Sequence, residues 1–142
     1  MRYDLIFYTA KKTSYCEKRL RKLMSTIDSS ANRVVSATSP TELGEEVTHG
    51  LRLCPLVIIV GGLRSPYDDN LATVLSRVFS NSSLTLDNMR KLTSDDALGY
   101  AVRCGSQMLL ALPDDPDEIE SLLSPDLLKY LSEKLTSNKP NK

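Results

Sequence analysis

The stretch VIIVGGLRSPYDD, residues 57–69, carries the strongest structural signal in the chain. Its start belongs to the apolar run PLVIIV (55–60), and such an uninterrupted run is typical of a strand buried on both faces of a sheet. Gly61 and Gly62 follow at once. Glycines directly after a buried strand allow the backbone to approach a ligand closely. The sequence therefore predicts a central strand that leads into a ligand-binding loop.

Strands and helices alternate on either side of this stretch. Period-2 and apolar runs predict strands at 3–9, 32–38 and 55–60, and helical spacing of apolar residues predicts helices at 14–27, 39–53 and 67–80. The second of these helices has a clear start. Ser39 is its predicted N-cap, Pro40 occupies the first helical position, and Glu42 completes a capping box.

The pattern changes towards the C-terminus. The segments 99–104 and 107–113 flank the pair Gly105–Ser106, which predicts a hairpin. LDNMRKL (86–92) before it is interpreted as one or two turns of helix. Two helices, 114–123 and 124–135, are predicted after the hairpin.

This order of elements is typical of an α/β three-layer α/β/α sandwich with a mostly parallel sheet and a C-terminal hairpin. We expect a single domain over residues 1–136 and a disordered tail at 137–142. Ligands of such sheets bind outside the carboxyl ends of the strands. The loops expected there are 9–14, 37–39, 61–69 and 113–118.

The composition of the chain argues against several classes of function. Lys+Arg and Asp+Glu both number 18, so the formal net charge is zero and no basic excess indicates nucleic-acid binding. The basic residues near the N-terminus are interpreted as the solvated face of a helix: Lys11, Lys12, Lys18, Arg19, Arg21 and Lys22. No apolar run approaches the roughly 18 residues of a membrane span, and no signal peptide is recognised. These features predict a cytoplasmic protein with neither a nucleic-acid nor a membrane partner.

The cysteines and the single histidine point to no reaction. Cys16, Cys54 and Cys104 are odd in number and widely spaced, which argues against a disulfide framework and against a zinc site. We expect buried, inert thiols in a reducing compartment. His49 is expected on the surface of its helix. No residue is assigned a catalytic role, and whether the chain is an enzyme stays open.

Two motifs, in this order and with a hairpin before the second, resemble the molybdopterin-binding-like domain of molybdenum cofactor biosynthesis proteins. The resemblance is nearest to the N-terminal domain of the competence/damage-inducible protein A family and spans about residues 33–123. There the first loop reads GGLGPTxDD and the second LPGPPxEL. The matching residues are Gly61, Gly62, Leu63, Asp68 and Asp69 in the first loop, and Leu112, Pro113, Pro116, Glu118 and Ile119 in the second.

The resemblance implies a pterin- or nucleotide-like small-molecule ligand, a homo-oligomer, and a molybdopterin-like ligand or Mg²⁺ as cofactor. Two alternatives stay open: an interaction module of the same fold that has lost its ligand, and a metal-dependent hydrolase of nucleotide pyrophosphates. The candidate ligand-binding residues are Gly61, Gly62, Arg64, Asp68, Asp69, Pro113, Asp114 and Glu118.

Departures from the family pattern affect the expected ligand. Arg64 stands where the family has glycine, and Asp114 and Asp115 replace glycine and proline. At ~4 Å and an effective dielectric near 20, each like-charge pair between these acids and a phosphate costs about 4 kcal/mol. Arg64 is therefore expected either to bind a phosphate or to pair with Asp114 or Asp115 across the gap.

The acids also have structural interpretations. Asp68 and Asp69 fit an N-cap and first-turn acid as well as a carboxylate for substrate or cation. Asp115, Pro116 and Glu118 form a capping-box pattern. We accordingly expect no dedicated metal site and at best weak Mg²⁺ binding.

Overall fold

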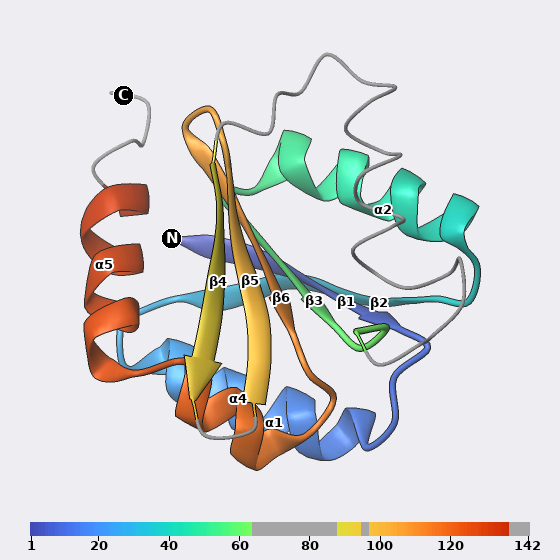
Figure 1. The fold of residues 1–142 in the computed structure, drawn as a ribbon. Helices are drawn as coiled ribbons and strands as arrows, with labels where there is room; N and C mark the ends of the chain where they lie inside the picture. Colours follow the sequence, from blue (N-terminus) through green and yellow to red (C-terminus); the bar gives the residue numbers. More distant parts are fainter. Residues whose placement is uncertain (64–87, 95–96, 137–142) are drawn as a thin grey trace.

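The computed structural model describes residues 1–63, 88–94 and 97–136, and Figure 1 shows their arrangement. The strands are β1 (Arg2–Tyr8), β2 (Ser30–Ala37), β3 (Leu56–Val60), β4 (Asn88–Ser94), β5 (Ala97–Cys104) and β6 (Gln107–Leu112). The helices are α1 (Thr13–Ser25), α2 (Pro40–Leu53), α4 (Pro116–Leu122) and α5 (Pro125–Thr136). The helix predicted at 67–80 and the tail predicted at 137–142 lie outside the described residues.

The strands form one six-stranded sheet in the order β2-β1-β3-β6-β5-β4. Strands β2, β1, β3 and β6 pair in parallel, while β5 and β4 continue the sheet in antiparallel pairing. All five residues of β3 are buried, which confirms the prediction for the apolar run. The mixed, mostly parallel α/β sheet is therefore the one that the sequence predicts.

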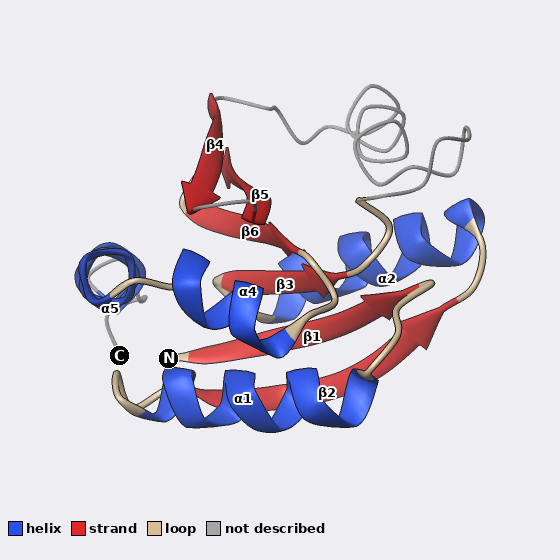
Figure 2. Ribbon diagram, turned by 60° about the horizontal axis from the view of Figure 1, so that its bottom comes forward, coloured by secondary structure: helices blue, strands red, loops and turns tan. Residues whose placement is uncertain are grey.

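Helices cover both faces of this sheet. Alternation along β1 directs Leu5 and Phe7 into the core beneath α1, α4 and α5, and Ile6 and Tyr8 into the core beneath α2. Figure 2 shows α1 and α4 on one face with α2 behind the sheet. Helix α1 contributes the buried residues Cys16, Leu20 and Met24, and α2 contributes Leu43, Val47, Gly50 and Leu51.

The predicted start of α2 is confirmed. Ser39 Oγ accepts the N–H of Glu42 at 3.2 Å, and Pro40 is the first helical residue. The Glu42 carboxylate bonds one residue earlier than a standard capping box, because it accepts from the N–H and hydroxyl of Thr38 at 3.2 and 2.6 Å. These bonds from Thr38 lower the pKa of Glu42.

The prediction of helix at 86–92 is wrong, because residues 88–94 form β4. Leu, Met, Arg and Lys favour helix locally, but here β4 pairs along its whole length with β5. Gly105, by contrast, turns the predicted hairpin between β5 and β6 with φ 63°. The β5–β6 pair is confirmed from Tyr100↔Ala111 to Cys104↔Gln107.

The thiols of Cys16 and Cys54 are buried and free. Burial is the largest cause that raises the pKa of Cys16 to about 11 and that of Cys54 to about 12. Both thiols are consequently protonated at neutral pH, as expected for inert residues. His49 is exposed on α2.

A buried ionic network that the sequence analysis missed ties the start of β1 to β2 and α2. Asp4 is fully buried, and its carboxylate accepts from Arg33 Nε at 2.6 Å and Asn32 Nδ2 at 3.0 Å. Cys54 Sγ lies 3.4 Å from the same carboxylate. Arg33 also reaches Glu46 Oε1 at 2.8 Å. Burial opposes the charged guanidinium, yet the bonds to Asp4 and Glu46 raise the pKa of Arg33.

Candidate functional site

Three loops meet at the carboxyl ends of β1, β3 and β6. These strands are neighbours in the sheet, and their ladders end at the pairs Phe7↔Val60 and Val60↔Leu112. The ladder continues into the loops, since Gly61 N–H donates to the Leu112 carbonyl at 3.0 Å. The loops Thr9–Lys12, Gly61–Leu63 and Pro113–Asp115 therefore start at one edge of the sheet. Ligands of parallel α/β sheets bind at this edge.

A cavity of about 330 Å³ lies among these loops; we call it the loop cavity. Its lining residues are Thr9, Lys11, Gly61, Gly62, Leu63, Pro113 and Asp114. Four of the residues that the sequence predicts for the site thus lie together, namely Gly61, Gly62, Pro113 and Asp114. Glu118 is the third residue of α4 and is not among the lining residues.

Gly61 has a role that the sequence pattern did not reveal. Its φ is 106°, and a Cβ there would lie 2.3 Å from the Tyr8 carbonyl oxygen and 2.9 Å from the Ala10 Cβ. The missing side chain therefore lets the loop after β3 pack on the loop after β1. Gly62, with φ 77°, lines the cavity, so close approach to a ligand remains a prediction for Gly62.

The loop after β1 is linked to the loop after β6 through two acids. Lys11 N–H donates to Asp114 Oδ2 at 2.8 Å, and Lys12 Nζ lies 3.3 Å from Asp115 Oδ2. The interpretation of Lys11 and Lys12 as part of a solvated helix face is wrong, because α1 begins at Thr13. Thr9 and Lys12 have φ values of 45° and 54°, a strained region for residues with a side chain.

Asp115 caps the N-terminus of α4 and forms an ion pair with Lys12. Its carboxylate accepts the N–H groups of Asp117 at 2.9 Å and Glu118 at 3.2 Å, and Pro116 follows it as the first helical residue. The predicted cap is confirmed. The bond from the Glu118 N–H is the largest cause that lowers the pKa of Asp115, burial opposes it, and Lys12 adds to it.

Asp114 differs from Asp115 because only one of its carboxylate oxygens accepts a hydrogen bond from a described residue. Its side chain is half-buried in the wall of the loop cavity. Oδ2 accepts from Lys11 N–H, while Oδ1 has no hydrogen-bond partner among the residues that the structure describes. The Lys11 ammonium likewise makes no ion pair within that part of the chain. The lining of the loop cavity thus includes an acidic residue, a lysine, two glycines and the apolar residues Leu63 and Pro113.

The remaining predicted site residues, Arg64, Asp68 and Asp69, lie outside the described residues. Their phosphate, capping and cation-binding interpretations stay predictions. Within residues 1–63, 88–94 and 97–136, no group of three or more His, Cys, Asp or Glu side chains could hold a metal ion. In the same ranges, none of the helices is long and apolar enough to cross a membrane.

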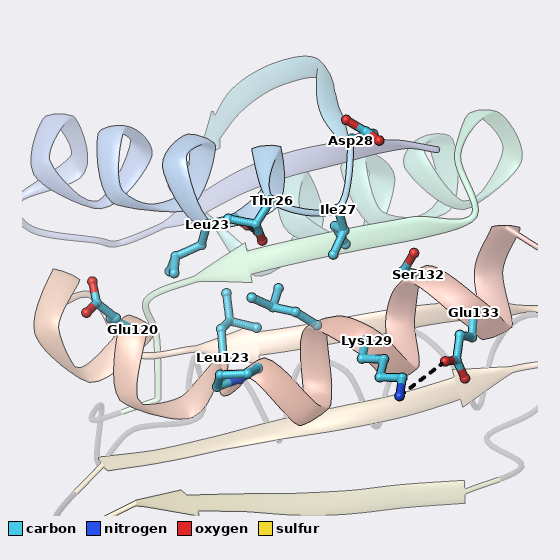
Figure 3. A pocket seen from close by; sticks show the side chains of 11 residues that line it. Leu23, Thr26, Ile27, Asp28, Glu120, Leu123, Lys129, Ser132 and Glu133 are labelled. Carbon is cyan, nitrogen blue, oxygen red and sulfur yellow. Dashed lines mark hydrogen bonds and ion pairs between the residues drawn. The ribbon is translucent and has the colours of Figure 1, made fainter.

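A larger cavity of about 800 Å³ lies at the opposite end of α1, between that helix, α4 and α5. Figure 3 shows Leu23 of α1, and Ile27 just after that helix, pointing towards Leu123, with Lys129 and Glu133 paired along α5. These two charged groups are 4.0 Å apart. Much of its lining is apolar, and its one lysine, Lys129, pairs with Glu133, so we do not build the candidate site on this cavity.

Solved structures of other proteins share this fold. The protein CinA of unknown function from Thermoplasma acidophilum superimposes with a TM-score of 0.69 and 16% identity, covering 94% of this chain and 97% of that one. The molybdopterin biosynthesis enzyme MoaB from Thermus thermophilus gives 0.65 and 16%, covering 99% of both chains. A molybdenum cofactor biosynthesis protein B gives 0.65 and 12%, covering 96% and 94%.

No family model and no curated protein sequence matches the chain. The structural likeness extends over nearly the whole chain, so the molybdopterin-binding-like α/β fold is confirmed. At these identities the likeness concerns the fold. The chemistry of the loop cavity has to be argued from its own residues.

Proposed function

We propose that this chain binds a small heterocyclic molecule of the pterin or nucleotide class in the loop cavity. The observation that supports this most is the cavity itself, about 330 Å³ in volume, at the carboxyl ends of three adjacent parallel strands. Ligand pockets usually measure about 300–1,000 Å³. The volume suits one bicyclic ring system with a short substituent better than a dinucleotide.

The lining supplies the groups that such a ligand needs. Leu63 and Pro113 can contact the faces of a planar ring, while the Thr9 hydroxyl and the Asp114 carboxylate can bond its polar edges. The Lys11 ammonium can attract a phosphate or carboxylate substituent. If a molybdopterin-like compound is the ligand, these residues would hold its ring and its anionic group, and the ligand itself would supply any chemistry with molybdenum.

The comparisons support the pterin class and a role related to molybdenum cofactor biosynthesis. Two of the structures with this fold are described as proteins of molybdenum cofactor or molybdopterin biosynthesis. We further propose that residues 1–136 act as one domain in the cytoplasm. The hydrolase alternative gains no support from the second loop, because Asp115 already serves α4 and Lys12 and is therefore not arranged with Asp114 as a metal-binding pair.

Isothermal titration calorimetry can test the proposal with pterin-6-carboxylate, guanosine monophosphate and adenosine monophosphate, each with and without Mg²⁺. Lys11→Ala should weaken binding of these anionic ligands, because it removes the ammonium and leaves the backbone bond to Asp114 in place. Lys18→Ala, an exposed lysine within α1, makes the same charge change away from the cavity. Absence of binding by the wild type, or equal losses in the two variants, would refute the proposal.

A further inference from the structure

We propose that Asp114 makes the loop cavity selective for rings that present an amino group beside a ring N–H, the edge shared by guanine and pterin. The inference rests on the proposed function, because it names the part of the ligand that this carboxylate would bind. It also goes beyond it, since a general pterin or nucleotide site need not distinguish a 2-amino ring from its 2-oxo or unsubstituted counterpart.

The position of the carboxylate supports this selectivity. Lys11 N–H donates to Asp114 Oδ2 at 2.8 Å, and this backbone bond orients the side chain before any ligand arrives. Oδ1 has no hydrogen-bond partner among the described residues, and the side chain is half-buried in the wall of the cavity. An ionised carboxylate only accepts hydrogen bonds, so a ligand group facing it must donate.

The charge around Asp114 points the same way. Of the two lysines bonded to the second loop, Lys12 pairs with Asp115, and Lys11 contacts Asp114 through its backbone N–H. Within the described part of the chain, no lysine or arginine side chain forms an ion pair with Asp114, which lines the cavity. A phosphate beside this carboxylate would be repelled. A ring with adjacent N–H donors would be held by charge-assisted bonds, which are stronger than neutral ones.

Rings without this edge should bind more weakly, and two analogues lack the edge in different ways. Hypoxanthine lacks the amino group and offers one donor fewer. Lumazine, a pteridine with oxygen in place of the 2-amino group, places an acceptor opposite the carboxylate. A buried polar group that loses its partner discriminates strongly between analogues. The comparison therefore isolates the edge of the ring from its size and stacking.

Calorimetric titration of matched ligand pairs tests the inference. Guanosine monophosphate and inosine monophosphate differ in the 2-amino group alone, and pterin and lumazine differ in amino against oxo. Wild type should prefer the amino member of each pair by about 10- to 100-fold. Asp114→Asn should reduce this preference to about threefold or less, because the amide can still accept Lys11 N–H but loses the charge and turns a donor towards the ligand.

Asp115→Asn is the matched control. It removes the same charge from the adjacent residue while keeping a good N-cap, and it should retain the wild-type preference. Thermal unfolding of both variants shows whether they fold, and the wild-type ratios stand without them. If wild type binds both members of each pair equally, the inference fails and the proposed function stands. If it binds none of the four compounds, both fail together.

Discussion

Gly61 fixes the relation between two loops of the site. The loop after β3 lies so close to the loop after β1 that a Cβ on Gly61 would lie 2.3 Å from the Tyr8 carbonyl oxygen. The sequence indicated that glycine matters here, because Gly61 and Gly62 follow a buried strand. The contact with Tyr8 depends on the pairing of β1 with β3, which lie about 50 residues apart in the chain. The sequence could predict that a glycine is needed at position 61, but not the contact with Tyr8 that requires it.

Gly61→Ala should therefore destabilise the fold by about 3 kcal/mol or more, because the added atom meets backbone and φ is positive. Urea unfolding followed by circular dichroism measures this change. Gly105→Ala is the control: its φ is 63° but nothing lies within 4 Å of the added Cβ, so it should cost about 1 kcal/mol. Equal losses in the two variants would show that backbone conformation, and not the contact with Tyr8, explains Gly61.

Asp4 shows what sequence patterns miss at the scale of one residue. In RYDLIFY, a single acid within an apolar strand gives no indication of its partner. Arg33 and Asn32 are about 30 residues away and meet Asp4 only because β1 pairs with β2. Burial of an acid requires such partners, but neither partner can be chosen from composition or spacing.

Asp4→Ala should lower the free energy of unfolding by about 2–4 kcal/mol, because it leaves the half-buried Arg33 without its closest anion. Glu46 remains bonded to Arg33, which keeps the loss below that of a fully isolated charge. Arg21→Ala breaks the more exposed Glu17–Arg21 pair and should change stability by about 0.5 kcal/mol or less. Chemical denaturation of both variants gives the comparison, and similar small losses would contradict a structural role for the Asp4 network.

For helices and strands, features set by residues within one turn of each other were predicted correctly, whereas a strand set by pairing with a distant segment was not. The starts of α2 and α4 were predicted from Ser39–Pro40 and Asp115–Pro116, because a cap is formed by residues within one turn of each other. The segment that forms β4 was predicted as helix, because its strand conformation depends on pairing with β5. Capping signals therefore constrain helices well, while an edge strand with few apolar residues escapes detection.

The cap of α4 predicts a dependence of stability on pH. Asp115→Ala should cost about 1 kcal/mol near neutral pH, since two N–H groups lose their acceptor. Because the pKa of Asp115 is lowered in the folded state, its ionic contribution is complete above the unfolded pKa and is lost as the pH falls through the folded pKa. Asp115→Asn, which cannot titrate, should therefore differ most from wild type near pH 7. Unfolding curves from about pH 7 to about pH 2 measure whether that difference shrinks on acidification; a constant difference would contradict the assignment.

For the whole molecule, alternating strands and helices were enough to predict the α/β layers and the parallel strands. The order of the strands in space could not be predicted, because a parallel neighbour is chosen by packing and not by adjacency in the chain. Because the neighbours of a strand could not be predicted, only part of the site could be predicted. Gly61, Gly62, Pro113 and Asp114 lie on loops with recognisable motifs, whereas Thr9 and Lys11 carry no motif and join the cavity only through the neighbouring position of β1.

The single-domain proposal makes a prediction about thiol labelling. Cys16 belongs to α1 on one face of the sheet, and Cys54 follows α2 on the other. Both are buried with raised pKa values, so iodoacetamide should label neither in the folded protein. In increasing urea both should become reactive over the same transition, as in a cooperative unit. Peptide mapping by mass spectrometry follows each thiol separately, and two distinct transitions would contradict a single domain.

The homo-oligomer that the resemblance implies also belongs to this scale. In the sheet, β5 is covered by β4, so β4 forms one border of the sheet. Arg90 and Lys91 are exposed there, and charges on an edge strand discourage indiscriminate pairing. We propose a specific oligomer of two or three copies. Light scattering at micromolar concentration should give a mass of two or three times 15.8 kDa, and a monomer would contradict the proposal.

The position of β3 between β1 and β6 has a consequence for synthesis on the ribosome. Strand β3 obtains its second neighbour only when β6 has been made, about 50 residues later, which at ~5–20 residues per second takes about 3–10 s. Until then the apolar run Leu56–Val60 has an unpaired edge of the kind that associates with other chains. Nascent chains that end before Gln107 should therefore depend on chaperones. A ribosome stalled in this interval would carry an incomplete sheet that is prone to aggregation.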